Sequence, residues 1–367
     1  MENFKIARSE AKDTSEAVKS IKEQLSGIDA CLVLYFVSTL YPVETVSKEM
    51  ADAFPGVQTV GCTTAGEMIT GSIGLNSIVA MAWHNSTLKH LQIELLENIK
   101  EDCAKAVAKA FKSFEKTLGI SMHELDPERY VGMLLVDGLS KCEERLNDSL
   151  GNLTNVPFIG GSAGDDLKFQ STWVFVNGKA YNNAAVFLLM KPTNGYITLK
   201  TQSFNITGKK LIPTKVDELE RIIYEFDGAP ASEAYATALG ITPDELLNTM
   251  GEYPLGLVFD EDNFFVRSPQ QFIGTAVTFA CMTKEGSELR VLEPTDIVAT
   301  TRDVLKKLGQ MQAIVDFNCA YRFTELQRKN QLNDYAAIFD VPTIGFSTYG
   351  ESYIGHINQT STMLIIK

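Results

Sequence analysis

The stretch Gly160-Gly161-Ser162-Ala163-Gly164-Asp165-Asp166 follows a short apolar run, and two other stretches of the chain resemble it. These are Gly61-Cys62-Thr63-Thr64-Ala65-Gly66-Glu67 and Gly345-Phe346-Ser347-Thr348-Tyr349-Gly350-Glu351. Each is a turn of small residues that carries hydroxyl or thiol groups and contains a glycine followed by an acid. We call them the glycine-acid loops 61–67, 160–166 and 345–351.

The likeness extends upstream of the glycine-acid loops. Three apolar runs, 31–37, 131–136 and 313–317, precede them at similar distances, and each run ends in a turn of small or polar residues. The common order of strand, helix, strand and loop is typical of a βαβ-sized unit. A recurring order of elements indicates an internal repeat, so we expect this unit three times.

Antiparallel strands and a helical segment complete the expected fold. Asn177-Gly178 between two apolar runs predicts a tight hairpin, because both residues tolerate the positive φ values of a type I′ turn. We expect helices over 216–226 and 230–239, and a third that begins at Thr242 with a capping box. The predicted class is α/β (mixed α+β), with two closely packed lobes and mixed sheets built from recurring strand-helix-strand units.

Composition narrows the class of protein. The formal net charge is −13, which argues against nucleic acids and anionic membranes as partners, because their phosphates would be repelled. The amino-terminal residues are polar, and no apolar run reaches the ~18 residues that span a bilayer. Six cysteines lie far apart without a C-x-x-C pair, as expected for reduced thiols. We therefore expect a cytoplasmic protein without a structural metal.

Common catalytic and nucleotide-binding motifs are missing from the sequence. It contains no Walker A motif and no G-x-G-x-x-G. Residues 160–164 match G-x-S-x-G, but a nucleophile elbow should lead straight into a helix, whereas this loop leads into acids and then strands. We expect no enzymatic activity; a hydrolase that uses Ser162 or Cys319 is a less favoured alternative.

The glycine-acid loops predict a small-ligand pocket. Backbone N–H groups and hydroxyls in such turns can line a pocket, and the acids can hold an amine. The competing interpretation is that the acids only cap their own turns. Arg322, just past a buried strand, could hold a carboxylate or pair with an acid of the protein. The candidate ligand-binding residues are Cys62, Thr63, Glu67, Gly161, Ser162, Asp165, Asp166, Cys319, Arg322, Tyr349 and Glu351.

The ordered set of the three loops, 318–322 and 355–360 resembles the FIST family (F-box and intracellular signal transduction). The resemblance implies a FIST N domain over 1–223 and a FIST C domain over 224–367. It also implies sensing of a small ligand, with amino acids proposed, and an output partner such as a histidine kinase or diguanylate cyclase. No cofactor is expected. The alternative is a haem-binding nitric-oxide sensor, for which His356 is the candidate ligand.

Overall fold

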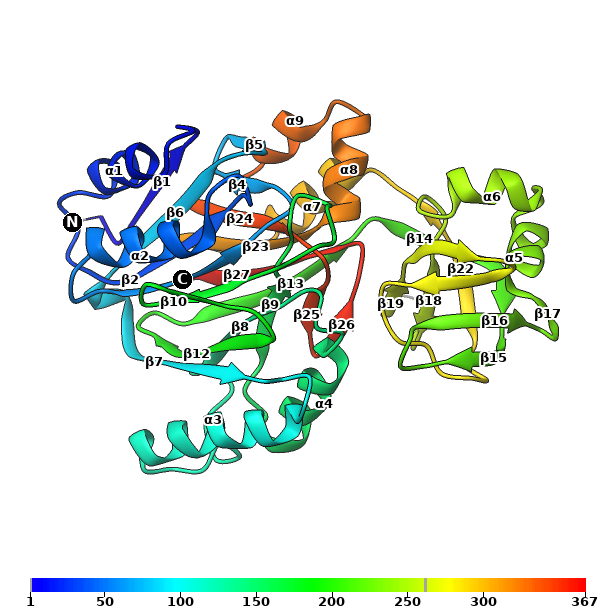
Figure 1. Ribbon diagram of the computed structural model, residues 1–367, viewed down its shortest axis with the longest axis horizontal. Helices are drawn as coiled ribbons and strands as arrows, with labels where there is room; N and C mark the ends of the chain where they lie inside the picture. Colours follow the sequence, from blue (N-terminus) through cyan, green and yellow to red (C-terminus); the bar gives the residue numbers. More distant parts are fainter. Residues whose placement is uncertain (1, 261–262) are drawn as a thin grey trace. The chain divides into compact units, whose positions relative to one another are not determined.

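The computed structural model describes residues 2–260 and 263–367 (Figure 1). Its contacts divide the chain into two compact units. Unit 1 comprises the residues up to Lys200, Arg302–His356 and Ser361–Lys367; unit 2 comprises Thr201–Thr301 and Ile357–Thr360. Compactness thus divides the chain differently from the expected sequence domains 1–223 and 224–367, whose boundary stays a prediction.

Unit 1 contains three copies of one order of elements. The first copy consists of β1 (Phe4–Ser9), α1 (Thr14–Gln24), β2 (Ala30–Val37), α2 (Val43–Ala53), β3 (Gln58–Thr63), β4 (Glu67–Ile69), β5 (Ser72–Gly74) and β6 (Ile78–His84). A 3₁₀ turn, Asn85–Thr87, leads to the second: β7 (Leu88–Glu97), α3 (Cys103–Leu118), β8 (Val131–Val136), α4 (Glu143–Leu153), β9 (Phe158–Ser162), β10 (Val174–Val176), β11 (Lys179–Tyr181) and β12 (Ala184–Pro192).

The third copy is interrupted, because unit 2 lies in the chain between its first strand and its first helix. It consists of β13 (Tyr196–Gln202), α7 (Ile297–Leu305), β23 (Ala313–Cys319), α8 (Ala320–Arg328), α9 (Leu332–Ala336), β24 (Thr343–Thr348), β25 (Glu351–Tyr353), β26 (Gly355–Ile357) and β27 (Thr360–Ile366). The predicted recurrence of a strand-helix-strand unit is confirmed, as is the mixed α/β class.

Three six-stranded sheets have the same internal order. They run β1-β6-β2-β3-β10-β11, β7-β12-β8-β9-β25-β26 and β13-β27-β23-β24-β4-β5. In each, two parallel strands lie at the centre, β2 with β3, β8 with β9, and β23 with β24. The hairpin that follows each glycine-acid loop leaves its own copy: β4 pairs with β24, β10 with β3, and β25 with β9. The exchange is cyclic, so every sheet contains strands of two copies.

A glycine at the same place in each parallel pair permits close strand contact. Gly61, Gly160 and Gly345 pair with Tyr35, Leu134 and Asp316. A Cβ atom on these glycines would lie 2.0, 1.8 and 2.3 Å from the carbonyl oxygens of those three partners. A methyl group does not fit at such distances, so the repeat requires glycine here.

The sheets bury one face against one another and the other face against helices. The inner core joins all three sheets, through residues such as Phe36, Met133 and Phe317. The outer faces carry α1 and α2 on the first sheet and α3 and α4 on the second, with α8 and α9 on the third (Figure 1). The parallel strands are buried on both faces, which explains why they read as unbroken apolar runs.

Several local predictions are confirmed. Asn177 and Gly178 have φ values of 47° and 86°, as a type I′ turn requires. The capping box of Thr242 and Glu245 begins α6 (Pro243–Thr249), and α5 (Ala231–Leu239) matches the helix expected over 230–239.

Unit 2 consists mainly of two antiparallel sheets, β14-β22-β18-β19 and β15-β16-β21-β20. Their strands are β14 (Phe204–Leu211), β15 (Pro213–Asp217), β16 (Ile222–Phe226), β18 (Leu255–Val258), β19 (Phe264–Arg267), β20 (Pro269–Ile273), β21 (Ala276–Phe279) and β22 (Leu289–Pro294), with the short β17 (Ala229–Pro230) beside β16.

The helix expected over 216–226 is wrong, because this stretch contains the turn between β15 and β16. The Asp217 carboxylate accepts from the N–H of Glu220, and Arg221 has a φ of +60°. Val216 then pairs with Ile223 across the hairpin. The β-branched and aromatic residues of this stretch favour strands, although their spacing also fits one face of a helix.

No helix among the described residues is long and apolar enough to cross a bilayer. All six cysteines are free thiols, and five of them are buried.

Candidate functional site

The three glycine-acid loops meet and are hydrogen-bonded in a ring. Equivalent N–H groups donate to equivalent carbonyls around this ring: Gly164 to Thr63 at 3.0 Å, Ala65 to Ser347 at 3.0 Å, and Tyr349 to Ser162 at 3.2 Å. Gly164 packs so tightly that an added Cβ would lie 2.7 Å from the Ala65 nitrogen. The structure thus brings together the three loops that the sequence predicted to line one site.

Two of the acids are buried counterparts of each other. Glu67 begins β4 and Glu351 begins β25, and each accepts a short hydrogen bond from the threonine three residues earlier, Thr64 or Thr348. Glu67 also accepts from the N–H and hydroxyl of Ser77, at 3.0 and 2.8 Å. Burial nevertheless raises the pKa of Glu67 to about 7, against the ordinary 4.5.

The second copy departs from this pattern. Phe346, Gly161 and Cys62 hold the same position in the three central strands β24, β9 and β3. Glu67 pairs with Phe346 and Glu351 pairs with Gly161, whereas Val174 pairs with Cys62. The structural counterpart of the two buried glutamates is therefore a valine. Asp165 and Asp166 belong to residues 165–172, an extra segment that the other two copies lack.

Asp165 holds this extra segment together. Its carboxylate accepts from the backbone N–H groups of Phe169, Gln170 and Ser171 at 2.8, 2.6 and 2.9 Å, and from the hydroxyl of Tyr349. Burial, followed by the bond to Asp165, raises the pKa of the Tyr349 phenol well above its ordinary value. These contacts give Asp165 the part of a turn cap, as the competing interpretation of the sequence expected.

Asp166 ties the same segment to the first copy. Its Oδ2 atom accepts from the N–H of Thr39 at 3.1 Å and from the Ser38 hydroxyl at 3.2 Å, with Lys168 at 3.4 Å. Asp166, Leu167 and Phe169 all have positive φ values, between 53° and 61°. Phe169 is exposed and stacks on the Tyr349 ring, with 4.7 Å between the centroids.

Arg322 lies in a buried polar cluster between β23 and helices α8 and α9. Its Nε atom donates to Asn318 Oδ1 at 2.7 Å, and its guanidinium lies 5.7 Å from the centre of the Tyr335 ring. Asp316 accepts from Tyr335 at 3.0 Å and from Ser361 at 2.6 Å. Burial raises the pKa of Asp316 to about 6, although Ser361 and the Arg322 charge oppose the rise.

This cluster adjoins loop 345–351. Asn318 and Ser347 are neighbours across the parallel strands β23 and β24. Within the described residues, neither Asn318 Nδ2 nor Ser347 Oγ has a hydrogen-bond partner, and both side chains are buried. We call Asp316, Asn318, Arg322, Tyr335 and Ser347 the Arg322 cluster. The sequence indicates Arg322, and Ser347 as a member of loop 345–351; an aspartate inside the apolar run 313–317 is the available signal for the rest.

The remaining predicted residues are buried and pack or form hydrogen bonds within the fold. Cys62 lies in the inner core, where burial raises its pKa well above the ordinary 9.0. Thr63 accepts from the N–H of Trp173 at 3.0 Å, and Gly161 packs against Thr348. Cys319 is buried at the start of α8.

Ser162 and His356 border a further polar cluster that the sequence did not predict. Ser162 Oγ donates to Glu143 Oε1 at 3.2 Å, and His356 lies close to Glu143 and Glu144. The sequence carries no signal for either acid, because acids are common in the first turn of a helix.

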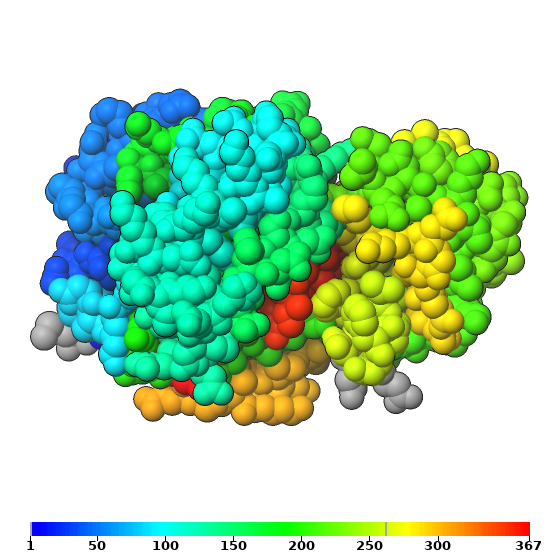
Figure 2. All heavy atoms as spheres, turned by 90° about the horizontal axis from the view of Figure 1, so that it is seen from below, coloured from blue at the N-terminus to red at the C-terminus, as the bar shows by residue number. Residues whose placement is uncertain are grey.

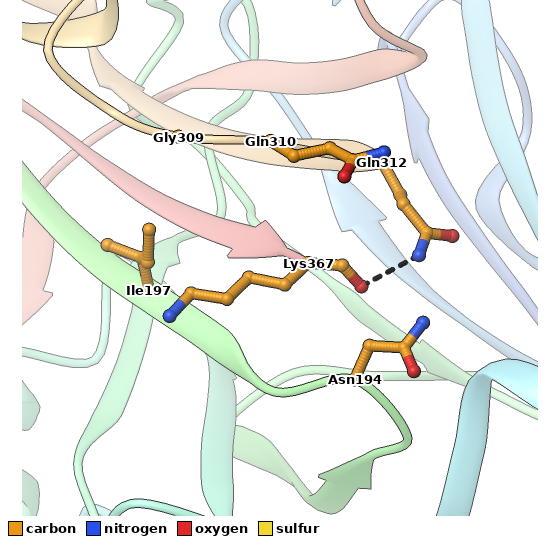
Figure 3. A pocket seen from close by; sticks show the side chains of 6 residues that line it. All are labelled: Asn194, Ile197, Gly309, Gln310, Gln312 and Lys367. Atoms are coloured by element: carbon orange, nitrogen blue, oxygen red, sulfur yellow. Dashed lines mark hydrogen bonds between the residues drawn. The ribbon is translucent and has the colours of Figure 1, made fainter.

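A surface hollow lies elsewhere in unit 1. It has a volume of about 560 Å³ and is lined by Asn194, Ile197, Gly309, Gln310, Gln312 and Lys367 (Figure 3). Gln312 spans part of it and donates to the carbonyl of Lys367 at 2.8 Å. None of these lining residues belongs to a glycine-acid loop or to the Arg322 cluster, so the hollow does not mark the predicted site.

Comparison with known proteins supplies the family. The FIST N domain matches residues 31–229, and the FIST C domain matches residues 231–353. The chain is also 24% identical over 386 aligned positions to "Uncharacterized protein MJ1623" of Methanocaldococcus jannaschii, covering 93% of this chain and 73% of that protein. Together the two domains cover most of the sequence, so the chain belongs to the FIST family, a family of sensory and signalling domains.

Proposed function

We propose that this protein is a cytoplasmic, non-enzymatic sensor of a small carboxylate ligand, an amino acid or a related metabolite. It acts on a separate output protein, such as a histidine kinase or a diguanylate cyclase. Family membership supports the sensory role. The chemical class of the ligand is inferred from the side chains of the Arg322 cluster.

One observation carries the proposal: two buried polar atoms without a partner adjoin a buried guanidinium. Leaving a buried donor without an acceptor costs about 1–3 kcal/mol, so such atoms call for an explanation. Asn318 Nδ2 is a donor, Ser347 Oγ can donate, and the Arg322 guanidinium carries a positive charge. A carboxylate accepts from all three kinds of group, and Arg322 favours it by charge.

The ligand also needs a group that holds its amine. Glu351 and Asp165 remain our candidates, and Ser162 would bond either end of the molecule. Asp165 accepts three backbone N–H groups and Glu351 accepts from the Thr348 hydroxyl, so either acid would have to exchange a protein contact for the amine. Because the cluster is buried, the ligand enters only when neighbouring elements open. If the ligand binds either the open or the closed arrangement of these elements more tightly, it shifts the protein toward that arrangement, and this shift is the signal.

Thermal unfolding against a panel of amino acids and small carboxylates tests the proposal. A ligand at ~100 times its dissociation constant stabilises the folded state by about 2.7 kcal/mol. The decisive variant is Ser347→Ala, which removes a hydroxyl that has no partner among the described residues. It should leave the free protein as stable as before and weaken binding about tenfold or more.

Tyr35→Phe is the matched control. It also removes a buried hydroxyl without a partner in the described chain, but from the first sheet, where no ligand contact is expected. The proposal fails if no panel member stabilises the protein, or if Ser347→Ala binds the stabilising compound as tightly as the parent. Covalent labelling of Ser162 or Cys319 by serine or thiol probes would instead favour an enzyme.

A further inference from the structure

The three copies of the repeat allow one position to be compared in three surroundings. In every sheet, the hairpin received from another copy lies beneath a helix that follows a central parallel strand. Beneath α2, β10 and β11 supply Phe175 and Ala180, which join an apolar cluster. Near α9, β4 and β5 supply Met68 and Ile73, which are buried. The received hairpins of these two sheets thus present apolar side chains to the helices that cover them.

The second sheet fills the same layer with polar side chains. Beneath α4, the hairpin β25–β26 supplies Ser352 and His356, both buried. The helix itself begins with Glu143, whereas α2 begins with Val43 and α8 with Ala320. Glu143 is only 2% exposed and His356 only 5%. Glu143 and His356 are thus buried ionisable groups where the received hairpins of the other two sheets present apolar side chains, and burying such groups costs stability unless their charges are compensated.

The geometry of the polar layer is that of a small cage. One ligand atom each from Glu143, Glu144 and His356 can be chosen so that all three lie within 4.8 Å of one another. The two acids come from the first turn of α4 and the imidazole from β26, so residues far apart in the sequence converge on one point.

The surrounding residues hold these groups in place. Ser162 Oγ donates to Glu143 Oε1 at 3.2 Å. Asn147 Nδ2 donates to the Glu143 carbonyl at 2.8 Å and to Ser352 Oγ at 3.1 Å. Gly350 makes room for the imidazole, since a Cβ there would lie 2.1 Å from His356 Cε1. Outer groups that orient ligating side chains in this way are typical of metal sites.

We propose that Glu143, Glu144 and His356 bind a divalent transition-metal ion of the zinc, manganese or iron(II) type. Two carboxylates and one imidazole suit these ions, whereas calcium and magnesium prefer oxygen ligands alone. Three protein ligands leave a coordination position open for water or for another molecule. The charge of the ion offsets the cost of burying the carboxylates.

Haem is a poorer occupant of the same place. A porphyrin needs room beside the imidazole, but the His356 ring lies against Gly350 and next to two carboxylates. An ion, by contrast, has a route from solvent, because Glu144 is partly exposed. Figure 2 shows the red part of the chain, which includes β25–β26, reaching the surface beside the green-cyan residues of α4.

The test is a metal titration of the full-length protein after dialysis against a chelator. Cobalt(II) serves as the probe because its visible absorption reports ligand geometry, and zinc is then added in competition. We expect one cobalt ion per chain, an absorption band that zinc removes, and a raised unfolding midpoint with metal. Glu144→Gln and His356→Gln should each weaken binding at least tenfold.

Glu44→Gln is the matched control, since Glu44 has the same place in α2 as Glu144 in α4 and is exposed. It should bind cobalt like the parent. Glu144→Gln keeps the test valid if His356→Gln does not fold, because its side chain is only partly buried. Absence of stoichiometric binding, or binding unchanged in Glu144→Gln and His356→Gln, would overturn the proposal and leave a hydrogen-bonded cluster only. Loss of the carboxylate ligand response in Ser347→Ala is a separate result, because Ser347 lies outside this cage.

Discussion

The buried Glu67 side chain should make the folded state less stable as the pH rises. The side chain is fully buried, and its folded-state pKa of about 7 lies above the ordinary 4.5. Between these values the folded state holds a proton that the unfolded state has released. The free energy of unfolding should therefore be fully supported below about pH 4.5 and fall as the pH rises through about 7.

The size of the effect follows from the two pKa values. At 1.36 kcal/mol per pH unit, the span from 4.5 to about 7 corresponds to about 3 kcal/mol. Glu67→Gln removes the titrating group and keeps the hydrogen bonds: its carbonyl accepts from Ser77 and its NH₂ donates to the Thr64 hydroxyl. The variant should be within about 1 kcal/mol of the parent at pH 5 and exceed its stability by about 3 kcal/mol at pH 8.

Urea unfolding of parent and variant from pH 5 to pH 8, followed by tryptophan fluorescence, gives the measurement. Both tryptophans, Trp83 and Trp173, lie in unit 1 with Glu67, so the signal reports the relevant unit. Comparing the two proteins at each pH cancels the contributions of other titrating groups to the pH dependence of stability. Exposed Glu44→Gln serves as control and should show the pH profile of the parent. If Glu67→Gln shows the same profile as well, or is the less stable protein at pH 8, the reasoning about Glu67 is refuted.

Three further predictions concern the fold. Gly160→Ala should lower the unfolding free energy by about 3 kcal/mol or more, because its Cβ would lie 1.8 Å from the Leu134 oxygen. Gly151→Ala is the control: no atom lies within 4 Å of its Cβ position, so it should be neutral or stabilising in the same denaturation assay. Thr242→Ala should destabilise unit 2 by about 1 kcal/mol through loss of the capping box, with unchanged tryptophan fluorescence as evidence that unit 1 is intact. Asn177→Ala should cost about 1 kcal/mol, because alanine disfavours a φ of 47° and loses the bond to the Thr59 N–H; an unchanged unfolding midpoint would contradict this.

The sequence supported the repeat because its signals are local. Apolar runs, the small-residue turns and the order of elements are all properties of neighbouring residues, and each reappears in the structure. The exchange of hairpins between copies gave no such signal. Which strand receives β4, β10 or β25 depends on how three similar units meet, and short strands of three residues have little pattern of their own.

The candidate site was predicted in outline only. Matching glycine with the next acid aligned Asp165 with Glu67 and Glu351, although the strand register makes Val174 their counterpart. An inserted segment can contain a motif that resembles the repeat by chance. Only the strand pairing distinguishes such a motif from the true counterpart of Glu67 and Glu351. The metal cage lay beyond prediction for a similar reason: a glutamate in the first turn of a helix is common, and its burial beside a distant histidine is a tertiary fact.

The cyclic exchange of hairpins has a consequence for how the chain folds as it is synthesised. The first sheet can be completed once β11 has left the ribosome, because all of its strands precede residue 182. The second sheet must wait for β25 and β26, and the third for β27, which end the chain. Unit 2 lies in between, so β9 presents an open edge for as long as that unit takes to be made. Such edges pair readily with other chains, so we expect the nascent protein to depend on chaperones during this interval.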